Sequence, residues 1–485
     1  MTDMKSFQWM VGTESEFGAA SRPTSGDAVA QRLVQTLARA KVYSGVKRGS
    51  SGLWLMQGGS AYYDVGNHPE YCTPECLWQD IAKYEWAGPL IMQDLALASD
   101  WSFLPPGADV WLLKNNTDAG ARNAYGNHLN FMMPCLSKAG GDVMNFQESL
   151  ESFAEATGSM MATLPLIVGA GVVVSRFTAP AATLGGKDFA FRISARSAFV
   201  SEVMGNSSTR GRPFFLSRAE HHAKKDLSYR LQVLLLDANI LPSVIELKMG
   251  LIVLMLRMWA AGEIEPLRLS DPVDALHRVS EDWRAPLEVE GGRWMTAAEI
   301  QAHYLHEAKC YVKCHGLWEF GPLLEAWEYQ VGLFLGATEV PRELCGRNDW
   351  VTKWLLIEGK LAQPVESSYR TAEEISLKYH GFLLGERFNM SLPVKLAQRY
   401  GPPGFLQAAR EACFEPPANS RAQMRRRFIE ILQEHAPVGW EDLAGVDWPY
   451  LKYDNITLMT DTPWVSEPER LELLRRKLTE ETRAA

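Results

Sequence analysis

The chain has 485 residues, more than the roughly 250–300 at which a single hydrophobic core stops growing, so we expect one large domain and a smaller one. Hydrophobic residues make up 46% of the sequence and charged residues 22%, a globular composition that excludes disordered, collagen-like and coiled-coil proteins. The 49 basic and 58 acidic residues give a net charge of −9, which argues against a nucleic-acid partner. Scattered cysteines and an N-terminus without an apolar signal-peptide core predict a cytoplasmic protein with no membrane partner.

Hydrophobic patterns predict strands mainly in the first half of the chain and helices mainly in the second. Short β-branched or aromatic segments bounded by Gly, Asn or Asp predict strands at residues 7–18, 53–65, 110–115, 127–133, 188–194 and 230–236. A helical period predicts helices at residues 27–40, 74–98, 145–158, 242–262, 297–335 and 371–386. Because strands and helices do not alternate regularly, the pattern favours an α+β fold, with a largely antiparallel sheet backed by helices.

The C-terminal part differs in composition from the rest. Proline-rich breaks at residues 402–404 and 416–417 precede a basic helical segment and a tail that contains Trp and Tyr. We therefore predict a large domain over residues 1–405 and a small C-terminal domain over residues 406–485.

The first predicted strand carries two carboxylates, Glu14 and Glu16, in the sequence GTESEFG. Residues two apart in a strand point to the same face, so both side chains would lie on one side of the sheet. A magnesium ion, which prefers oxygen ligands, would relieve their mutual repulsion. A solvated edge strand is the alternative interpretation.

A second acidic segment follows at residues 60–75. Tyr62 and Asp64 share one face of its strand, and the turn after them folds Glu70 back toward both. With Glu75, the segment holds three carboxylates within twelve residues. This density favours a metal-binding or general-base cluster over surface decoration.

Two further segments carry candidates for anion or ligand binding. One is the strand that contains His128, and the other contains Arg210, Arg212 and Arg218. Guanidinium groups hold phosphate oxygens well, although pairing with surface carboxylates is the alternative. The chain lacks a P-loop and a dinucleotide fingerprint, so any ATP would be bound without a Walker motif.

Seven motifs, in this order, resemble those of the Pup ligase and Pup deamidase (depupylase) family, whose core is similar to glutamine synthetases and other carboxylate–amine ligases. They are VGTESEFG, AYYDVGNHPEYCTPEC, KNNTD, AYGNHLNF, STRGRPFFLSRAEHHA, RLQVLLLDAN, and RAQMRRRF followed by VDWPYLK. Together they span nearly the whole chain. The resemblance implies a glutamine-synthetase-like curved sheet cradle backed by helices, with a small C-terminal domain that contributes to the nucleotide site.

The resemblance also implies roles for single residues, with Mg²⁺ and ATP as cofactors. Asp64 would be the catalytic base. The residues implied for the magnesium site are Glu14, Tyr62 and Glu70. Those implied for nucleotide binding are Thr73, Trp448 and Arg218. Further pocket candidates are Glu16, His128, His222, Arg210 and Ser60.

The spacing around Asp64 resembles the ligase branch of the family. The deamidase branch usually has a long insertion before this strand, whereas here only about 45 residues separate Gly18 from Asp64. The resemblance therefore implies an ATP-dependent ligase that joins the side-chain carboxylate of a modifier's C-terminal Glu to a target lysine through an acyl phosphate. The implied partners are a Pup-like modifier and lysine-bearing target proteins.

Some positions depart from the family pattern. Ser60 stands where the family usually has an ATP-contacting Arg, and Leu129 replaces a Glu. Ala219 and His221 replace an Asp and a Pro. Three alternatives therefore stay open: a depupylase or deamidase of the same fold, a small-molecule carboxylate–amine ligase, and a nucleotide-binding protein without catalysis.

Overall fold

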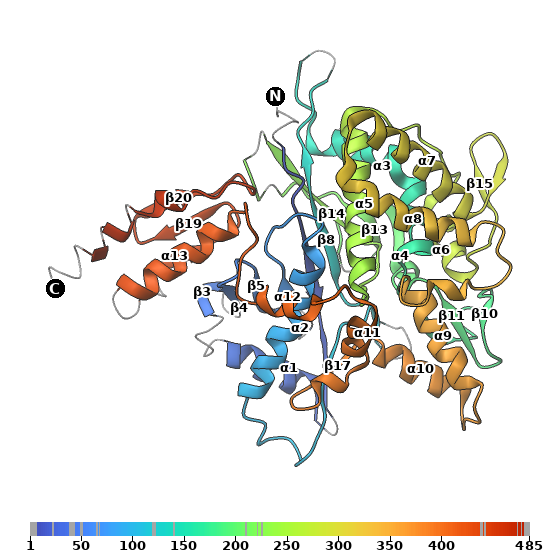
Figure 1. Ribbon diagram of the computed structural model, residues 1–485, viewed down its shortest axis with the longest axis horizontal. Helices are drawn as coiled ribbons and strands as arrows, with labels where there is room; N and C mark the ends of the chain where they lie inside the picture. The colour runs from blue at the N-terminus through green and yellow to red at the C-terminus, as the bar shows by residue number, and fades with distance from the viewer. Residues whose placement is uncertain are drawn as a thin grey trace.

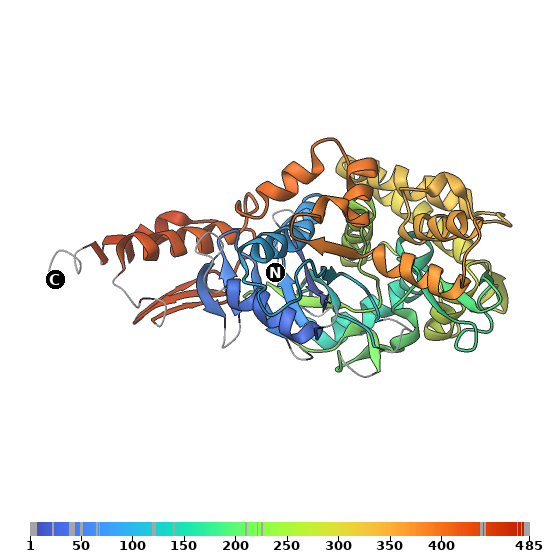
Figure 2. The same ribbon diagram turned by 90° about the horizontal axis from the view of Figure 1, so that it is seen from below.

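The computed structural model describes residues 7–21, 24–37, 44–48, 52–64, 66, 68–118, 123–138, 141–208, 211–220, 222–224, 227–436, 440, 443–472, 474–476 and 478–479. Figures 1 and 2 show three parts along the longest axis of the molecule. A helical body lies at one end, a large sheet in the middle, and the C-terminal elements at the other end.

The central sheet has nine strands in the order β12-β13-β14-β8-β1-β6-β5-β4-β3. Their bounds are β1 (Val11–Glu16), β3 (Ser44–Arg48), β4 (Gly52–Leu55), β5 (Ser60–Asp64), β6 (His68–Cys72), β8 (Asn127–Pro134), β12 (Val200–Gly205), β13 (Arg212–Leu216) and β14 (Ser228–Val233). Only β12 and β13 pair in parallel, and the other neighbours are antiparallel. The predicted α+β fold with a largely antiparallel sheet is confirmed.

Helices cover one face of this sheet, form the helical body or, in the case of α13, belong to the C-terminal elements (Figure 1). They are α1 (Gly26–Leu37), α2 (Ile81–Ala98), α3 (Phe146–Thr163), α4 (Pro165–Val168), α5 (Pro242–Ala261), α6 (Pro272–Glu281), α7 (Ala297–His315), α8 (Gly321–Phe334), α9 (Asp349–Leu361), α10 (Ser368–Lys378), α11 (Leu392–Tyr400), α12 (Phe405–Glu411) and α13 (Ala422–His435). The alternation in β1 follows from this cover. Thr13 and Ser15 are buried, whereas Glu14 and Glu16 lie partly exposed on the other face.

Four smaller sheets complete the described structure. They are β17 (Gly381–Leu384) with β7 (Val110–Leu113) and β2 (Gly18–Ala20); β10 (Leu184–Gly185) with β11 (Phe189–Arg192) and β9 (Val172–Ser175); β15 (Leu287–Val289) with β16 (Arg293–Met295); and β18 (Ala444–Val446) with β19 (Tyr450–Tyr453) and β20 (Ile456–Met459).

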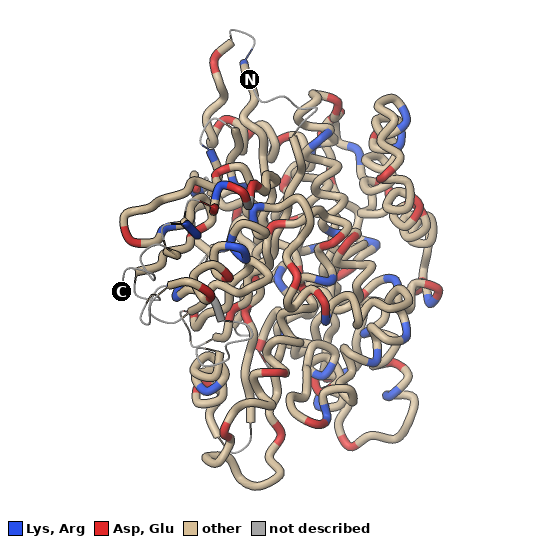
Figure 3. The backbone as a smooth tube through the Cα atoms, turned by 60° about the vertical axis from the view of Figure 1, so that its left-hand side comes forward, with Lys and Arg blue, Asp and Glu red and all other residues tan. Residues whose placement is uncertain are grey.

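Charged residues of both signs are interspersed along the described chain (Figure 3). Among the helices described, none combines the length and the apolar character that crossing a bilayer requires. The cytoplasmic location stays a prediction.

Two predicted helices differ from the structure. Residues 297–335 form two helices, because Gly316 adopts a left-handed conformation (φ 65°) that ends α7. Residues 371–386 contain the end of α10 and then strand β17, which pairs with β7. All four residues of β17 are buried, so tertiary pairing outweighs the local helical pattern.

A second hydrophobic cluster attaches the C-terminal elements to the edge of the central sheet. Val46 of β3 and Trp54 of β4 pack in it with Phe428 of α13 and Leu451 of β19. The C-terminal elements thereby cover an edge that would otherwise offer unpaired backbone groups. A domain that begins at residue 406 stays a prediction.

Buried ion pairs hold α13 against the loop that follows β6. Arg421 Nε donates to Glu75 Oε1 at 2.6 Å, and Arg425 pairs with Glu75 Oε2. The side chains of Arg421 and Arg425 are 2% and 0% exposed. Burial alone would raise the pKa of Glu75, but the charges of Arg421 and Arg425 outweigh it and lower the pKa to about 2.

We expect Glu75→Gln to lower the free energy of unfolding by about 3–5 kcal/mol, because it leaves two buried guanidinium groups without their counter-charge. Thermal unfolding followed by circular dichroism measures the loss. Glu155→Gln is the control, since Glu155 pairs with Arg268 on the surface, where the two side chains are 61% and 43% exposed. The control should lose less than about 1 kcal/mol. Equal losses of stability for the two substitutions would contradict a stabilising role for the buried ion pairs of Glu75.

The destabilisation by Glu75→Gln should also depend on pH. The folded-state pKa of about 2 lies below the ordinary value of 4.5, so the ionised Glu75 stabilises the fold fully above pH 4.5. This stabilisation is lost as the pH falls toward 2. The difference between the unmutated and Glu75→Gln proteins should therefore shrink between about pH 5 and pH 3, which unfolding curves across that range measure.

Candidate active site

Strand register gathers the predicted acidic residues on the face of the central sheet that the helices leave uncovered. β1 lies between β8 and β6, and Glu14 lies opposite His128 of β8. Glu16 lies opposite Glu70 of β6, which in turn lies opposite Tyr62 of β5. Residues directly opposite in neighbouring antiparallel strands share a face. Strand β1, strand β8 and the hairpin of β5 and β6 thus place their polar side chains on one face of the sheet.

Glu16, Asp64 and Glu70 form a group of carboxylates whose ligand oxygens all lie within 4.8 Å of one another. Three oxygen donors at this spacing fit a hard divalent cation such as Mg²⁺. Glu16 also accepts a hydrogen bond from the Gly126 amide at 2.8 Å and lies 3.4 Å from His68 Nδ1. Burial would raise the pKa of Glu16, but the contact with His68 and the hydrogen bond from Gly126 outweigh it, so its pKa is lowered.

Glu14 lies among donors and positive charge. Its Oε2 is 3.1 Å from His128 Nδ1, and its Oε1 accepts hydrogen bonds from Asn130 at 3.1 Å and Arg230 at 3.2 Å. Burial would raise the pKa of Glu14, but the hydrogen bond to His128 and the charges of His128 and Arg230 hold it at about 2. Glu14 is therefore a permanently ionised carboxylate at neutral pH.

Glu70 has the opposite electrostatic surroundings. It is 3% exposed, and burial followed by the negative charge of Glu14 raises its pKa well above the ordinary value. The neighbouring Tyr62 hydroxyl lowers the pKa of Glu70 but does not outweigh burial, and burial raises the pKa of Tyr62 as well. A bound cation would favour the ionised form of Glu70.

These side chains open into a cavity of about 330 Å³, a volume suited to a small-molecule ligand. The predicted site residues that line it are Glu14, Tyr62, Asp64, Glu70, His128, Arg218, His222 and Trp448. Eight of the twelve predicted residues therefore lie around one space.

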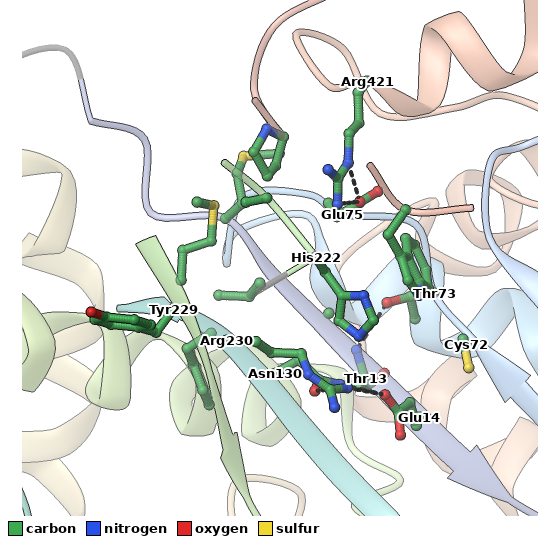
Figure 4. Close-up of a pocket in the computed structure, with 18 residues that line it drawn as sticks. Thr13, Glu14, Cys72, Thr73, Glu75, Asn130, His222, Tyr229, Arg230 and Arg421 are labelled. Carbon is green, nitrogen blue, oxygen red and sulfur yellow. Dashed lines mark hydrogen bonds and ion pairs between the residues drawn. The ribbon is translucent and has the colours of Figure 1, made fainter. Parts of the chain in front are cut away.

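A second cavity of about 80 Å³ adjoins the first and shares Glu14, His222, Arg230 and Trp448 with it. Thr73 lines this second cavity, and its Oγ1 accepts a hydrogen bond from the Thr13 amide at 2.9 Å. Figure 4 shows the Glu75–Arg421 pair at one end of the cavity and Glu14 with Arg230 at the other. The Glu75–Arg421 pair thus lines the same cavity as Glu14.

Trp448 reaches the cavities from the C-terminal part and is held there by contacts of its ring with Trp54 and Arg425. Its ring packs edge-on against Trp54 at 4.7 Å between centroids, and the guanidinium of Arg425 lies 5.0 Å from its ring. The His222 ring lies 6.3 Å away, and burial lowers the pKa of His222 to about 4, so this histidine is neutral at pH 7. A half-buried indole in this position offers a flat apolar surface to a base.

The predicted arginines lie in different surroundings. Arg218 is exposed and lines the larger cavity. Arg212 donates to the backbone carbonyls of Ser208 at 2.9 Å and Ala124 at 3.0 Å, so its hydrogen bonds stabilise the local backbone. Arg210 lies outside the described residues.

Sequence reasoning missed two cations that line the larger cavity, Arg48 and Arg230. Arg48 donates to Ser60 Oγ at 2.7 Å, so the predicted residue Ser60 is fully buried beside the arginine. Arg230 pairs with both Glu14 and Glu220. The strand predicted at 230–236 already contains Arg230 and could have marked it. No strand is predicted around Arg48, so no sequence signal singles it out.

The chain is similar in sequence to ligases over nearly its whole length. It is 31% identical over 481 residues to a Pup–protein ligase of Acidimicrobium ferrooxidans, which covers 96% of this chain and 97% of that protein. It is 32% identical over 486 residues to a Pup–protein ligase of Paenarthrobacter aurescens, covering 96% of this chain and 98% of that protein.

The fold is similar to two solved structures at 24% sequence identity. The crystal structure of the complex between the prokaryotic ubiquitin-like protein Pup and its ligase PafA matches with a TM-score of 0.79, covering 98% of this chain and 93% of that one. The structure of the Pup ligase PafA in complex with ADP matches with a TM-score of 0.72, covering 94% of each chain. A model of the family described as Pup-ligase protein matches residues 9–451. As its seven motifs predict, the chain belongs to the Pup-ligase family.

Proposed function

We propose that the chain is an ATP-dependent ligase that joins the side-chain carboxylate of a Pup-like modifier's C-terminal Glu to a lysine of a target protein. The observation that carries this proposal is one cavity that holds both Glu70 and Asp64 of the carboxylate group and Trp448 of the C-terminal part. Membership in the Pup-ligase family supports it, as do the two relatives named Pup–protein ligase.

We propose that Glu14, Tyr62 and Glu70 hold Mg²⁺, with Glu16 and Asp64 beside them. Glu70 belongs both to this predicted set and to the group of close carboxylates, so it is central to either arrangement. When bound, Mg²⁺ would neutralise part of the phosphate charge. Thr73 and Trp448 would bind the adenosine end of ATP, with Arg218 at the rim of the larger cavity.

The reaction has two steps. A carboxylate oxygen of the modifier's C-terminal Glu attacks the γ-phosphorus of ATP, the bond to the bridging oxygen breaks, and ADP leaves. The product is an acyl phosphate. Phosphate is a good leaving group, whereas the oxygen of the free carboxylate is a poor one. The target lysine nitrogen then attacks the acyl carbon and inorganic phosphate leaves, forming an isopeptide bond.

Asp64 is the proposed base for the second step. A lysine amine is protonated near pH 7 and becomes a nucleophile only when it loses a proton. Asp64 ends β5 opposite His68 and lines the larger cavity together with Glu70, so its carboxylate can accept that proton as the nitrogen attacks. The fixed charges of Glu14 and Glu16 beside it favour the approach of a cationic lysine.

We expect Asp64→Asn to reduce conjugation by about 10²- to 10⁴-fold while leaving ADP binding within about twofold, because the amide keeps the shape of the side chain but cannot take a proton. Mass spectrometry of a lysine-bearing acceptor, incubated with Mg-ATP and a small modifier ending in Glu, measures conjugation.

Asp142→Asn is the matched control, since Asp142 is exposed and does not line either cavity. Undiminished conjugation by Asp64→Asn would remove Asp64 from the base role. Cleavage of a preformed conjugate by the unmutated protein, without adduct formation, would favour the depupylase alternative.

Glu70→Gln should separate metal binding from stability. Because the pKa of Glu70 is raised well above its ordinary value, a neutral glutamine resembles the protonated side chain and should change the melting temperature little. The same change removes a charged oxygen ligand, so Mg-ADP should bind at least about tenfold more weakly. Calorimetric titration with ADP, with and without Mg²⁺, tests this expectation. If Mg²⁺ strengthens ADP binding equally in both proteins, Glu70 is not a metal ligand.

A further inference from the structure

Arg48 places a guanidinium group in the larger cavity from the edge of the sheet. It is the last residue of β3 and lines the cavity together with Glu14, Asp64 and Glu70. Its NH1 donates to Ser60 Oγ at 2.7 Å. These contacts tie a residue of an edge strand to β5, two strands away in the sheet.

The charge of Arg48 has no carboxylate partner among the described residues. Arg230 in the same cavity pairs with Glu14 and Glu220, whereas the hydrogen-bond partners of Arg48 are the neutral side chains of Ser60 and Cys72. The Arg48 guanidinium lies 3.9 Å from the centroid of the Tyr62 ring. This cation–π contact stabilises the positive charge of Arg48 but does not neutralise it. A half-buried guanidinium with free donors is suited to an oxyanion.

Arg48 also lies between the two ends of the proposed nucleotide site. The Trp54 ring lies 5.6 Å from its guanidinium and 4.7 Å from the ring of Trp448. On the other side, Tyr62 lies beneath Arg48 and opposite Glu70 in the strand register. A nucleotide with its base at Trp448 and its terminal phosphates near the carboxylates must cross this position.

We propose that Arg48 is a specificity-determining residue of this chain that binds a phosphate of the nucleotide. The proposal rests on the proposed nucleotide site and deepens it. Carboxylates repel phosphate oxygens, so a cavity that holds Glu14, Asp64 and Glu70 needs a positive charge where the phosphates pass. Arg48 supplies that charge from β3 and lies next to Ser60 of β5. The family resemblance implies an arginine at the position that Ser60 occupies.

A purely structural role is the competing explanation, because Arg48 also holds Ser60 and covers Tyr62. The two roles differ in their dependence on phosphate. If Arg48 binds phosphate, its loss weakens binding of ATP and ADP but not of adenosine. If it only maintains the shape of the pocket, all three ligands lose affinity together.

The test compares Arg48→Ala and Arg48→Gln with the unmutated protein. ADP and ATP affinities are measured by calorimetry, and adenosine affinity by NMR titration. Glutamine keeps a hydrogen-bond donor for Ser60, so it covers the case in which alanine disturbs the fold. We expect both substitutions to weaken ADP and ATP binding by roughly 10- to 100-fold and to leave adenosine binding within twofold.

Arg399→Ala is the control, since Arg399 also stacks on a tyrosine, with 5.2 Å between its guanidinium and the Tyr400 ring, but does not line either cavity. Unchanged ADP affinity in Arg48→Gln, or equal losses for ADP and adenosine, overturns the proposal. Failure of the proposed function is distinguishable, because it appears as absent conjugation by the unmutated protein, whereas the Arg48 proposal is decided by ADP, ATP and adenosine affinities. An unmutated protein that binds neither ADP nor ATP overturns the Arg48 proposal as well.

Discussion

The register of β1 between β6 and β8 is the constraint on which the rest of the site depends. Side chains alternate along a strand, so a slip by one residue would turn Glu14 and Glu16 toward the helices and bring Thr13 and Ser15 to the cavity. The helices prevent this, because they bury Thr13 and Ser15 on their side. The hydrophobic packing of one face therefore fixes the position of every carboxylate on the other.

Carboxylates gathered on one face of the sheet repel one another, which costs free energy. Other strands supply partners that offset this cost for Glu14 and Glu16 but not for Glu70. Arg230 comes from β14 and His128 from β8 to neutralise Glu14. His68 and the Gly126 amide stabilise the charge of Glu16. Glu70 gains no cationic partner among the described residues, and its raised pKa follows.

The sequence predicted local features well and contacts between distant segments poorly. Residues 242–262 were predicted as one helix, and α5 spans Pro242–Ala261, because Pro242 and Gly262 mark its two ends. Residues 371–386 were not correctly predicted, since β17 is a strand only by virtue of its pairing with β7. A local pattern carries no information about a partner more than two hundred residues away.

The same distinction holds for the site. Glu14 with Glu16, and Tyr62 with Asp64, could be recognised because each pair is two residues apart in one strand. Arg48 and Arg230 could not be assigned to the same site as these pairs. The positions of the two arginines depend on the order in which β3, β5 and β14 join the sheet. The motif resemblance supplied much of what spacing alone could not, including Thr73 and Trp448, which are far apart in sequence and line one cavity.

Trp54 connects the C-terminal hydrophobic cluster to the proposed nucleotide site, and this has a mechanical consequence for that site. Trp54 packs in the C-terminal cluster and contacts both Trp448 and Arg48. Arg425 in turn contacts Trp54 and Trp448 while it pairs with Glu75. A displacement of α13 would therefore move the base-binding surface and the Arg48 guanidinium together, whereas the carboxylates stay with β1, β5 and β6. If nucleotide binds at the proposed site, its affinity should therefore depend on how firmly the C-terminal elements hold the sheet edge, although none of the carboxylates of the group Glu16, Asp64 and Glu70 belongs to them.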